Sequence, residues 1–154
     1  MENQEEDMDK VKTKLLFVCV HNSARSQMAE AFFNKLAGEN LLAESAGLEP
    51  GVLNPLVIEV MKEIGIDISQ NQAKSVMDFF KQGKLYRYVI TVCDEGAAQK
   101  CPLFPGVTKT IRWSFADPAG FTGTWEEKLQ KTREVREQIK VKVAAFIKEI
   151  SIHD

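Results

Sequence analysis

Short apolar runs that end in polar loops are the first regular feature of this chain. Lys14–Val20 is such a run, mostly apolar and β-prone, and a polar loop follows it, as expected of a buried parallel strand. Leu41–Ser45 is a shorter candidate strand, Tyr86–Val92 is the clearest of the later strands, and Lys109–Trp113 is a weaker one. The pattern therefore predicts four strands.

Apolar residues at helical spacing lie between these runs. One stripe extends from Met28 to Leu36, and Gly38 can end that helix. A second predicted helix has Pro55 in its first turn and Gly65 just beyond its end. The predicted buried faces are Met28, Ala29, Phe32, Phe33 and Leu36 in the first helix and Leu56, Val57, Val60, Met61 and Ile64 in the second.

Two more helices complete the pattern. Ser75–Gln82 is predicted as a short helix that Gly83 ends, and Thr124 and Glu127 have the spacing of a capping box at the start of a long helix. The predicted buried face of the long helix is Val135, Ile139, Val143, Phe146 and Ile150. Because strands and helices alternate, we expect an α/β fold with three layers, a central four-stranded parallel sheet covered by helices on both faces.

Composition and charge narrow the class of protein. Of the 154 residues, 44% are hydrophobic and 27% are charged, as in ordinary globular domains. Residues 1–13 are nearly all polar or charged, so we expect a disordered tail followed by a single domain, residues 14–154. The chain has no signal-peptide core and no bilayer-length apolar run, which predicts a cytoplasmic protein. The net charge of −2 argues against nucleic acid or a membrane surface as a partner, and the polar surface pattern suits a monomer.

The segment between the first predicted strand and the first predicted helix carries the candidate chemistry. Cys19 and Arg25 are separated by five mostly small or polar residues. In such a loop the main-chain N–H groups can turn inward, and the following helix directs its positive end at the same point. Arg25 adds a planar fork that can hold two oxygens of a tetrahedral anion. The residues expected to bind the anion are Val20, His21, Asn22, Ser23, Ala24, Arg25 and Ser26.

The same field would stabilise the thiolate of Cys19, which makes this residue a candidate nucleophile. Ser26 can add a hydrogen bond to the sulfur, and Asn22 can brace the loop from within. The alternative is that Cys19 is a small core residue at the end of a strand, but its place between strand and helix, with Arg25 and Ser26 after it, favours catalysis. His21 has no partner at ligand spacing, so we interpret it as a solvated loop residue and predict no metal and no cofactor.

Three further candidates lie in loops beyond later predicted strands. Asp117, followed by Pro118, is a candidate general acid over an anion site, although a plain Asp-Pro turn is the simpler interpretation in isolation. Cys93 follows the Tyr86–Val92 strand, and Cys101 comes after a small, polar segment. These two thiols can form a disulfide if the loop moves, and chance loop cysteines are the alternative. There is no CxxC pair, so zinc is not indicated.

Together these segments resemble the thioredoxin-coupled arsenate reductases, which share the fold of the low-molecular-weight protein tyrosine phosphatases. The resemblance runs from about Lys14 to the C-terminal helix and includes all three cysteines. The stretches that carry it are Cys19–Glu30, Ser45–Gly47, Gly65–Ser69, Val92–Cys93 with Cys101–Pro102, and Trp113 with Asp117–Gly120.

The resemblance implies a relay of three cysteines. Cys19 would attack arsenate held by Arg25 and the loop, while Asp117 gives a proton to the departing oxygen. Cys93 would then attack Cys19 and release arsenite. Cys101 would attack Cys93, and the resulting disulfide would be reduced by thioredoxin or a similar thiol donor.

Three departures from relatives bear on this expectation. Ala24 stands where some relatives carry another cysteine, and the Cys93–Cys101 loop is one residue longer. Some relatives bind potassium with side chains at the positions of Asn22 and Glu30 and with a downstream aspartate. Lys74 takes the place of that aspartate here, and because a lysine ammonium group can occupy the role of the cation, no potassium site is predicted.

Two other interpretations stay open. A phosphatase acting through a phosphocysteine at Cys19 would use Arg25 and Asp117 but would give Cys93 and Cys101 no role; weak phosphatase activity is expected beside arsenate reduction. A non-catalytic sensor of oxyanions or redox state could use the same loop. The reductant also stays open between thioredoxin, glutaredoxin with glutathione, and another small thiol.

Overall fold

A parallel sheet with the strand order β2-β1-β3-β4 forms the centre of the protein. The computed structural model describes residues 13–92, 101 and 104–153. The strands, which correspond to the four predicted ones, are β1 (Thr13–Cys19), β2 (Leu41–Gly47), β3 (Tyr88–Thr91) and β4 (Lys109–Arg112). All neighbouring strands run parallel, so their carboxyl ends meet at one edge. The predicted tail lies outside the described residues except for Thr13, which belongs to β1 rather than to the tail.

β1 is an inner strand that contributes side chains to the two larger core clusters. Its apolar residues are fully buried and alternate between the two faces of the sheet, as side chains of a strand do. Leu15 and Phe17 belong to the larger cluster, which also contains residues of α2 and α6, whereas Leu16 and Val18 belong to a second cluster. A strand buried on both faces needs a continuous apolar run, which is the pattern of this segment.

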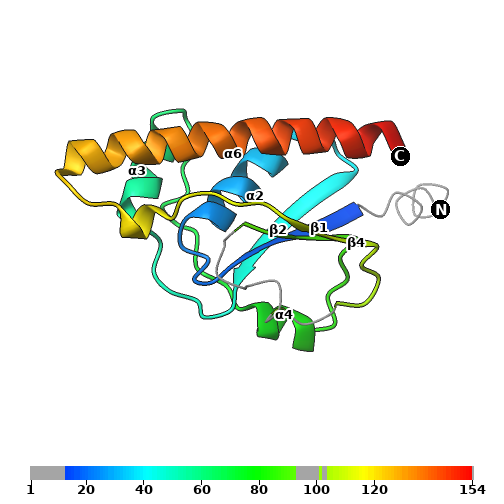
Figure 1. Cartoon of the computed structure of the whole chain (residues 1–154). Helices are drawn as coiled ribbons and strands as arrows, with labels where there is room; N and C mark the ends of the chain where they lie inside the picture. Colours follow the sequence, from blue (N-terminus) through cyan, green and yellow to red (C-terminus); the bar gives the residue numbers. More distant parts are fainter. Residues whose placement is uncertain (1–12, 93–100, 102–103, 154) are drawn as a thin grey trace.

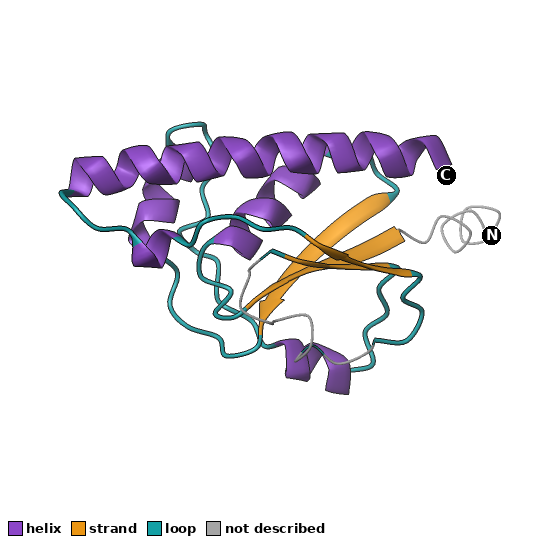
Figure 2. Cartoon of the chain, viewed as in Figure 1, coloured by secondary structure: helices purple, strands orange, loops and turns teal. Residues whose placement is uncertain are grey.

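Helices cover both faces of the sheet, which confirms the predicted three-layer α/β architecture (Figures 1 and 2). The elements outside the sheet are α2 (Arg25–Leu36), α3 (Pro55–Lys62), α4 (Val76–Lys81), the short 3₁₀ helix η1 (Pro118–Gly120) and α6 (Trp125–His153). In Figure 1 the long helix α6 runs over α2 and α3 on one side, and α4 lies on the other. None of the helices in the described ranges has the length and apolar composition that crossing a bilayer requires.

The predicted starts of α3 and α6 are confirmed, whereas α3 ends at Lys62 and leaves Ile64, predicted on its buried face, only partly buried beyond the helix. Asn54 caps α3 by accepting a hydrogen bond from Leu56 N at 2.8 Å, and Gly65 beyond that helix has a φ of 81°. At the start of α6, Thr124 and Glu127 form the predicted capping box with two reciprocal 3.1 Å hydrogen bonds.

The end of α2 differs from the prediction. Leu36 is 44% exposed instead of buried, and the helix ends in Ala37, whose backbone is extended. Asn34 bonds both main-chain groups of Ala43 in β2, at 2.8 and 2.9 Å. Because the extended Ala37 turns the chain back at once, Gly38 does not need the left-handed conformation of a glycine cap.

Candidate active site

The loop from Cys19 to Ser26 lies at the carboxyl edge of the sheet. Cys19 is the last residue of β1, and Arg25 is the first residue of α2. Ligands of open parallel sheets bind at this edge. The residue at the start of the helix, Ala24, has a methyl side chain, which cannot cap the first-turn N–H groups with a hydrogen bond.

Cys19 is buried, with 4% of the residue exposed to solvent. Its sulfur lies between two hydrogen-bonding groups. Asn22 N donates to Sγ at 3.1 Å, and Ser26 Oγ lies 2.8 Å from Sγ. Asn22 Nδ2 donates to the same Ser26 oxygen at 2.8 Å, an arrangement in which the Ser26 hydroxyl is able to donate to the sulfur. The sulfur of Cys19 thus contacts one main-chain donor and one hydroxyl group.

The segment 48–54 fixes the orientation of the peptide groups in the loop. N–H groups of that segment donate to the carbonyl oxygens of four loop residues, at distances from 2.7 to 3.1 Å. The pairs are Leu48 to Cys19, Glu49 to Val20, Gly51 to His21 and Asn54 to Ser23. In a trans peptide the N–H points away from the carbonyl. The N–H groups of the same peptide planes therefore face away from the segment, as an anion cradle requires.

Gly47 allows the loop to lie close to β2. A Cβ atom at this position would lie 2.7 Å from Val20 O, 2.8 Å from Asn22 N and 2.9 Å from the carbonyl carbon of His21. All three are backbone atoms, so any larger residue would displace the loop. Asn22 itself has a φ of 52°, a left-handed conformation that costs a non-glycine residue about 1 kcal/mol and that Asn adopts more readily than most.

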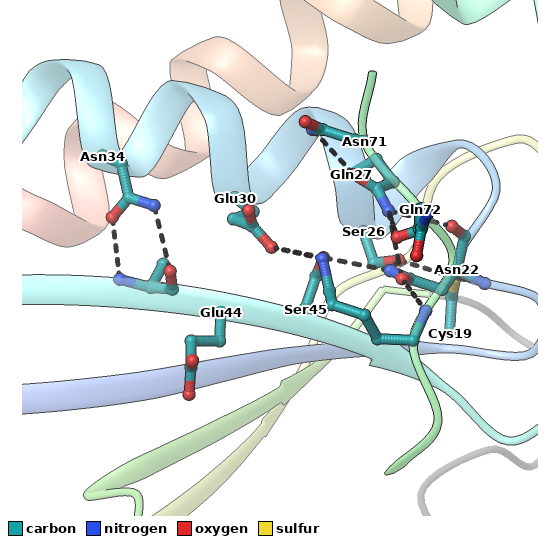
Figure 3. Close-up of polar contacts among 12 residues, drawn as sticks. Cys19, Asn22, Ser26, Gln27, Glu30, Asn34, Glu44, Ser45, Asn71 and Gln72 are labelled. Atoms are coloured by element: carbon teal, nitrogen blue, oxygen red, sulfur yellow. Dashed lines mark hydrogen bonds and ion pairs between the residues drawn. The ribbon is translucent and has the colours of Figure 1, made fainter. Parts of the chain in front are cut away.

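Figure 3 shows a chain of polar side chains that leads from Asn22 through Ser45 to Glu30. Asn22 Nδ2 also donates to Ser45 Oγ at 3.0 Å, and Ser45 Oγ donates to Glu30 Oε1 at 2.6 Å. Lys74 Nζ lies 3.4 Å from the same Glu30 oxygen, and Lys74 N donates to Asn22 Oδ1 at 2.9 Å. The ammonium group of Lys74 thus lies at the end of the Asn22–Ser45–Glu30 chain.

Arg25 and Asp117 meet although they are distant in sequence. Arg25 is 4% exposed; its NH1 group donates to Phe115 O at 2.9 Å, and its NH2 group lies 3.4 Å from Asp117 Oδ2. Asp117 Oδ1 accepts a hydrogen bond from Ala119 N at 3.0 Å, which caps η1. The Asp-Pro turn and the position near the anion loop therefore coexist, and the two sequence interpretations do not exclude one another.

His21 is exposed, and its Nδ1 lies 2.9 Å from Glu49 O, a contact that ties the loop to the segment 48–54. In the part of the chain that the structure describes, no three His, Cys, Asp or Glu side chains gather as metal ligands.

The other two cysteines stand apart from this arrangement. Cys93 lies outside the described residues. Cys101 is half-buried against the α4-side cluster of Leu16, Val18, Ala46, Val76, Phe79, Tyr86, Val89 and Phe104. Cys19 belongs to the other core cluster, so the structure does not bring Cys101 to Cys19. Burial raises the pKa of the Cys101 thiol to about 11.

Sequence reasoning missed Gln27. Its side chain is fully buried beside the loop and bonds Asn22, which no local pattern predicts. The available signal was a polar residue directly before the apolar Met28, near the inward side of a helix.

Comparison with known proteins agrees with this geometry. Residues 14–153 match the family described as low molecular weight phosphotyrosine protein phosphatase. The arsenate reductase of Oceanobacillus iheyensis is 40% identical over 137 residues, which cover 89% of this chain and 96% of that protein. A solved structure of an arsenate reductase in the phosphate binding state has a TM-score of 0.73 at 34% identity and covers 90% of this chain and 98% of its own.

A second solved structure, the thioredoxin-dependent arsenate reductase of Corynebacterium glutamicum, has a TM-score of 0.69 at 28% identity. The match covers 97% of this chain and 67% of that one. The fold, the loop geometry and these similarities agree: the chain belongs to the low molecular weight phosphotyrosine protein phosphatase family and, within it, to the arsenate reductases.

Proposed function

We propose that this protein reduces arsenate to arsenite through a relay of Cys19, Cys93 and Cys101, and that thioredoxin or an equivalent dithiol regenerates it. One observation carries the proposal: the buried sulfur of Cys19 accepts a hydrogen bond from Asn22 N and lies 2.8 Å from the Ser26 hydroxyl, in a loop that the buried Arg25 ends. The similarity to arsenate reductases supports arsenate as the anion. The thioredoxin-dependent relative from C. glutamicum supports a dithiol as the reductant.

The first step forms a bond between sulfur and arsenic. Arsenate binds to the inward N–H groups and to Arg25, and the thiolate of Cys19 attacks arsenic. One oxygen leaves with a proton, for which Asp117 is the candidate donor because its carboxyl group lies beside Arg25. Arsenic is still pentavalent in this adduct.

The next two steps move two electrons. Cys93 attacks the sulfur of Cys19, the electron pair of the sulfur–arsenic bond stays on arsenic, and arsenite leaves as the Cys19–Cys93 disulfide forms. Cys101 then attacks Cys93, which frees Cys19 as a thiolate and leaves a Cys93–Cys101 disulfide. An external dithiol reduces this disulfide, so each arsenate consumes one dithiol.

The test separates a single turnover from repeated turnover. In the proposed relay, Cys101→Ser still releases one arsenite per protein because Cys19 and Cys93 suffice for the first two steps. It loses steady NADPH oxidation with arsenate, thioredoxin and thioredoxin reductase. Repeated turnover by Cys101→Ser would remove Cys101 from the mechanism, and no arsenite from the native protein would contradict the reduction itself.

A phosphatase activity is the second candidate, and the family match favours it. Phosphate has the shape and charge of arsenate, so Cys19, Arg25 and Asp117 can act on a phosphoester in the same way. We expect slow hydrolysis of an aryl phosphate that is lost in Cys19→Ser and kept in Cys101→Ser. Fast hydrolysis without arsenite formation would make this the main activity.

A further inference from the structure

Gln27 is a fully buried polar residue in the first turn of α2. It follows the anion loop and is not among the residues that would touch an oxyanion. Its side-chain nitrogen Nε2 lies within hydrogen-bond distance of three oxygens: Asn22 O at 3.2 Å, Asn22 Oδ1 at 3.0 Å and Gln72 O at 3.1 Å. Its Oε1 accepts a hydrogen bond from Asn71 Nδ2 at 3.2 Å. Figure 3 shows Gln27 between the loop and the segment that contains Asn71 and Gln72.

The network allows only one orientation of this amide. Lys74 N donates to Asn22 Oδ1 at 2.9 Å, so that atom must be the amide oxygen of Asn22. Gln27 therefore faces two main-chain carbonyl oxygens and one amide oxygen, all of which need a donor. A reversed amide would direct oxygen at oxygen in a buried place. Gln27 thus acts on Asn22 as a donor.

Asn22 is the residue whose backbone must be held. Its φ of 52° lies in the left-handed region, and in this conformation its N–H points at Cys19 Sγ, 3.1 Å away. Gln27 bonds both the carbonyl oxygen and the side-chain oxygen of Asn22, so it restrains the residue at two atoms. Rotation of Asn22 toward a more ordinary φ would break these bonds and turn the donor away from the sulfur.

We propose that Gln27 is a positioning residue, which holds Asn22 in the conformation that keeps an N–H donor on Cys19 and so keeps the cysteine a ready nucleophile. It acts through Asn22 and does not touch the substrate. The segment 71–74 takes part because it supplies bonds to both Gln27 and Asn22. The inference rests on the proposed function only in taking Cys19 as the nucleophile.

The test measures the nucleophile without arsenate. The rate at which iodoacetamide alkylates Cys19 is followed against pH by mass spectrometry of the peptide that contains Cys19. Gln27→Met keeps the length of the side chain and removes its donor. We expect the midpoint of the alkylation profile to move to higher pH by about one unit, the size of a weakened hydrogen bond to a charged group.

Asn34→Leu is the matched control. Asn34 is a second side-chain amide on α2 that bonds main-chain groups, those of Ala43, but it lies away from the loop. Both variants are expected to lower the melting temperature, and only Gln27→Met should move the alkylation midpoint. An unchanged midpoint in folded Gln27→Met overturns the proposal, as does an equal shift in Asn34→Leu.

A second variant covers the case in which Gln27→Met does not fold. Asn71 is exposed, and Asn71→Ala removes only the donor to Gln27 Oε1. We expect a smaller shift in the same direction, and no shift would overturn the proposal. Because alkylation needs neither arsenate nor a reductant, failure of arsenate reduction and failure of this inference are separate results.

Discussion

The surroundings of Cys19 and Cys101 differ in kind although both residues are cysteines. Cys19 ends a central strand, and its sulfur contacts the Asn22 N–H and the Ser26 hydroxyl. Cys101 packs against the apolar α4-side cluster, where burial raises the pKa of its thiol to about 11. One environment offers hydrogen bonds to a negative sulfur, and the other penalises it.

This difference teaches how one chain can hold thiols for different steps. A nucleophile that attacks first must be charged before the substrate arrives. A thiol that attacks last is protected from side reactions if it stays neutral until a disulfide reaches it. The neutral thiol reacts slowly with oxidants and metals. The order of the proposed relay is therefore consistent with the surroundings of the two cysteines that the structure describes.

The largest expected effect comes from disturbing the Cys19 side. Gly47→Ala places a Cβ against three backbone atoms of the loop, so the cradle must shift. We expect kcat/KM for arsenate to fall about 100-fold, as a displacement near 1 Å can cause. Gly38→Ala is the control, because nothing lies within 4 Å of its Cβ position. Steady-state kinetics of both variants with arsenate test this expectation. An equal kcat/KM in the two variants would show that the loop tolerates the methyl group.

The surroundings of Cys101 are tested by the rate at which its thiol is alkylated. A pKa of about 11, against an ordinary 9.0, means that near neutral pH the thiolate fraction of native Cys101 is about 100-fold below that of the unfolded chain. Alkylation of the Cys101 peptide in the native protein should be slower by a similar factor. Equal rates in native and unfolded protein would mean that the thiol is open to solvent.

The same shift links stability to pH. Because the folded pKa is raised, the stability that neutral Cys101 provides is fully present below about pH 9 and is lost as pH rises through about 11. Cys101→Ala should reduce this alkaline loss in denaturant titrations at several pH values. A variant with the same loss as the native protein would assign it to other groups.

The smallest effect concerns Lys74. Removing its ammonium group in Lys74→Met leaves Glu30 without that cation, and we expect a stability loss of at most about 1 kcal/mol that potassium chloride partly restores. The Lys84–Glu44 pair, with nitrogen and oxygen 3.0 Å apart and similar exposure, provides the control. Lys84→Met should lose stability that potassium does not restore. If potassium rescues neither variant, Lys74 is an ordinary ion pair.

Much of the fold could be predicted because its signals are local. β1 is apolar throughout since both of its faces are buried, and the Thr124–Glu127 spacing marks the start of α6 by bonds three residues apart. The loop from Cys19 to Arg25 is also local, so its place between strand and helix could be predicted from order alone.

The rest of the site depends on contacts between distant segments. The need for glycine at position 47 arises from loop atoms more than twenty residues away, and the bonds of Gln27 to Gln72 and Asn71 cross 45 and 44 residues. Leu36 was predicted as buried because the helical period continues, but α2 ends where Ala37 turns back toward β2. Periodicity describes one element, and it does not tell where a neighbouring element begins.

The segment 48–54 holds the carbonyl groups of the loop through its main-chain N–H groups, and its contact with the His21 ring also uses a main-chain atom, Glu49 O. Main-chain bonds do not depend on which side chains the segment carries, provided that no proline removes one of the donors. Val52, for example, is 87% exposed. The side chains of this segment can therefore diverge during evolution, or be exchanged in the laboratory, while the main-chain bonds that orient the loop stay the same.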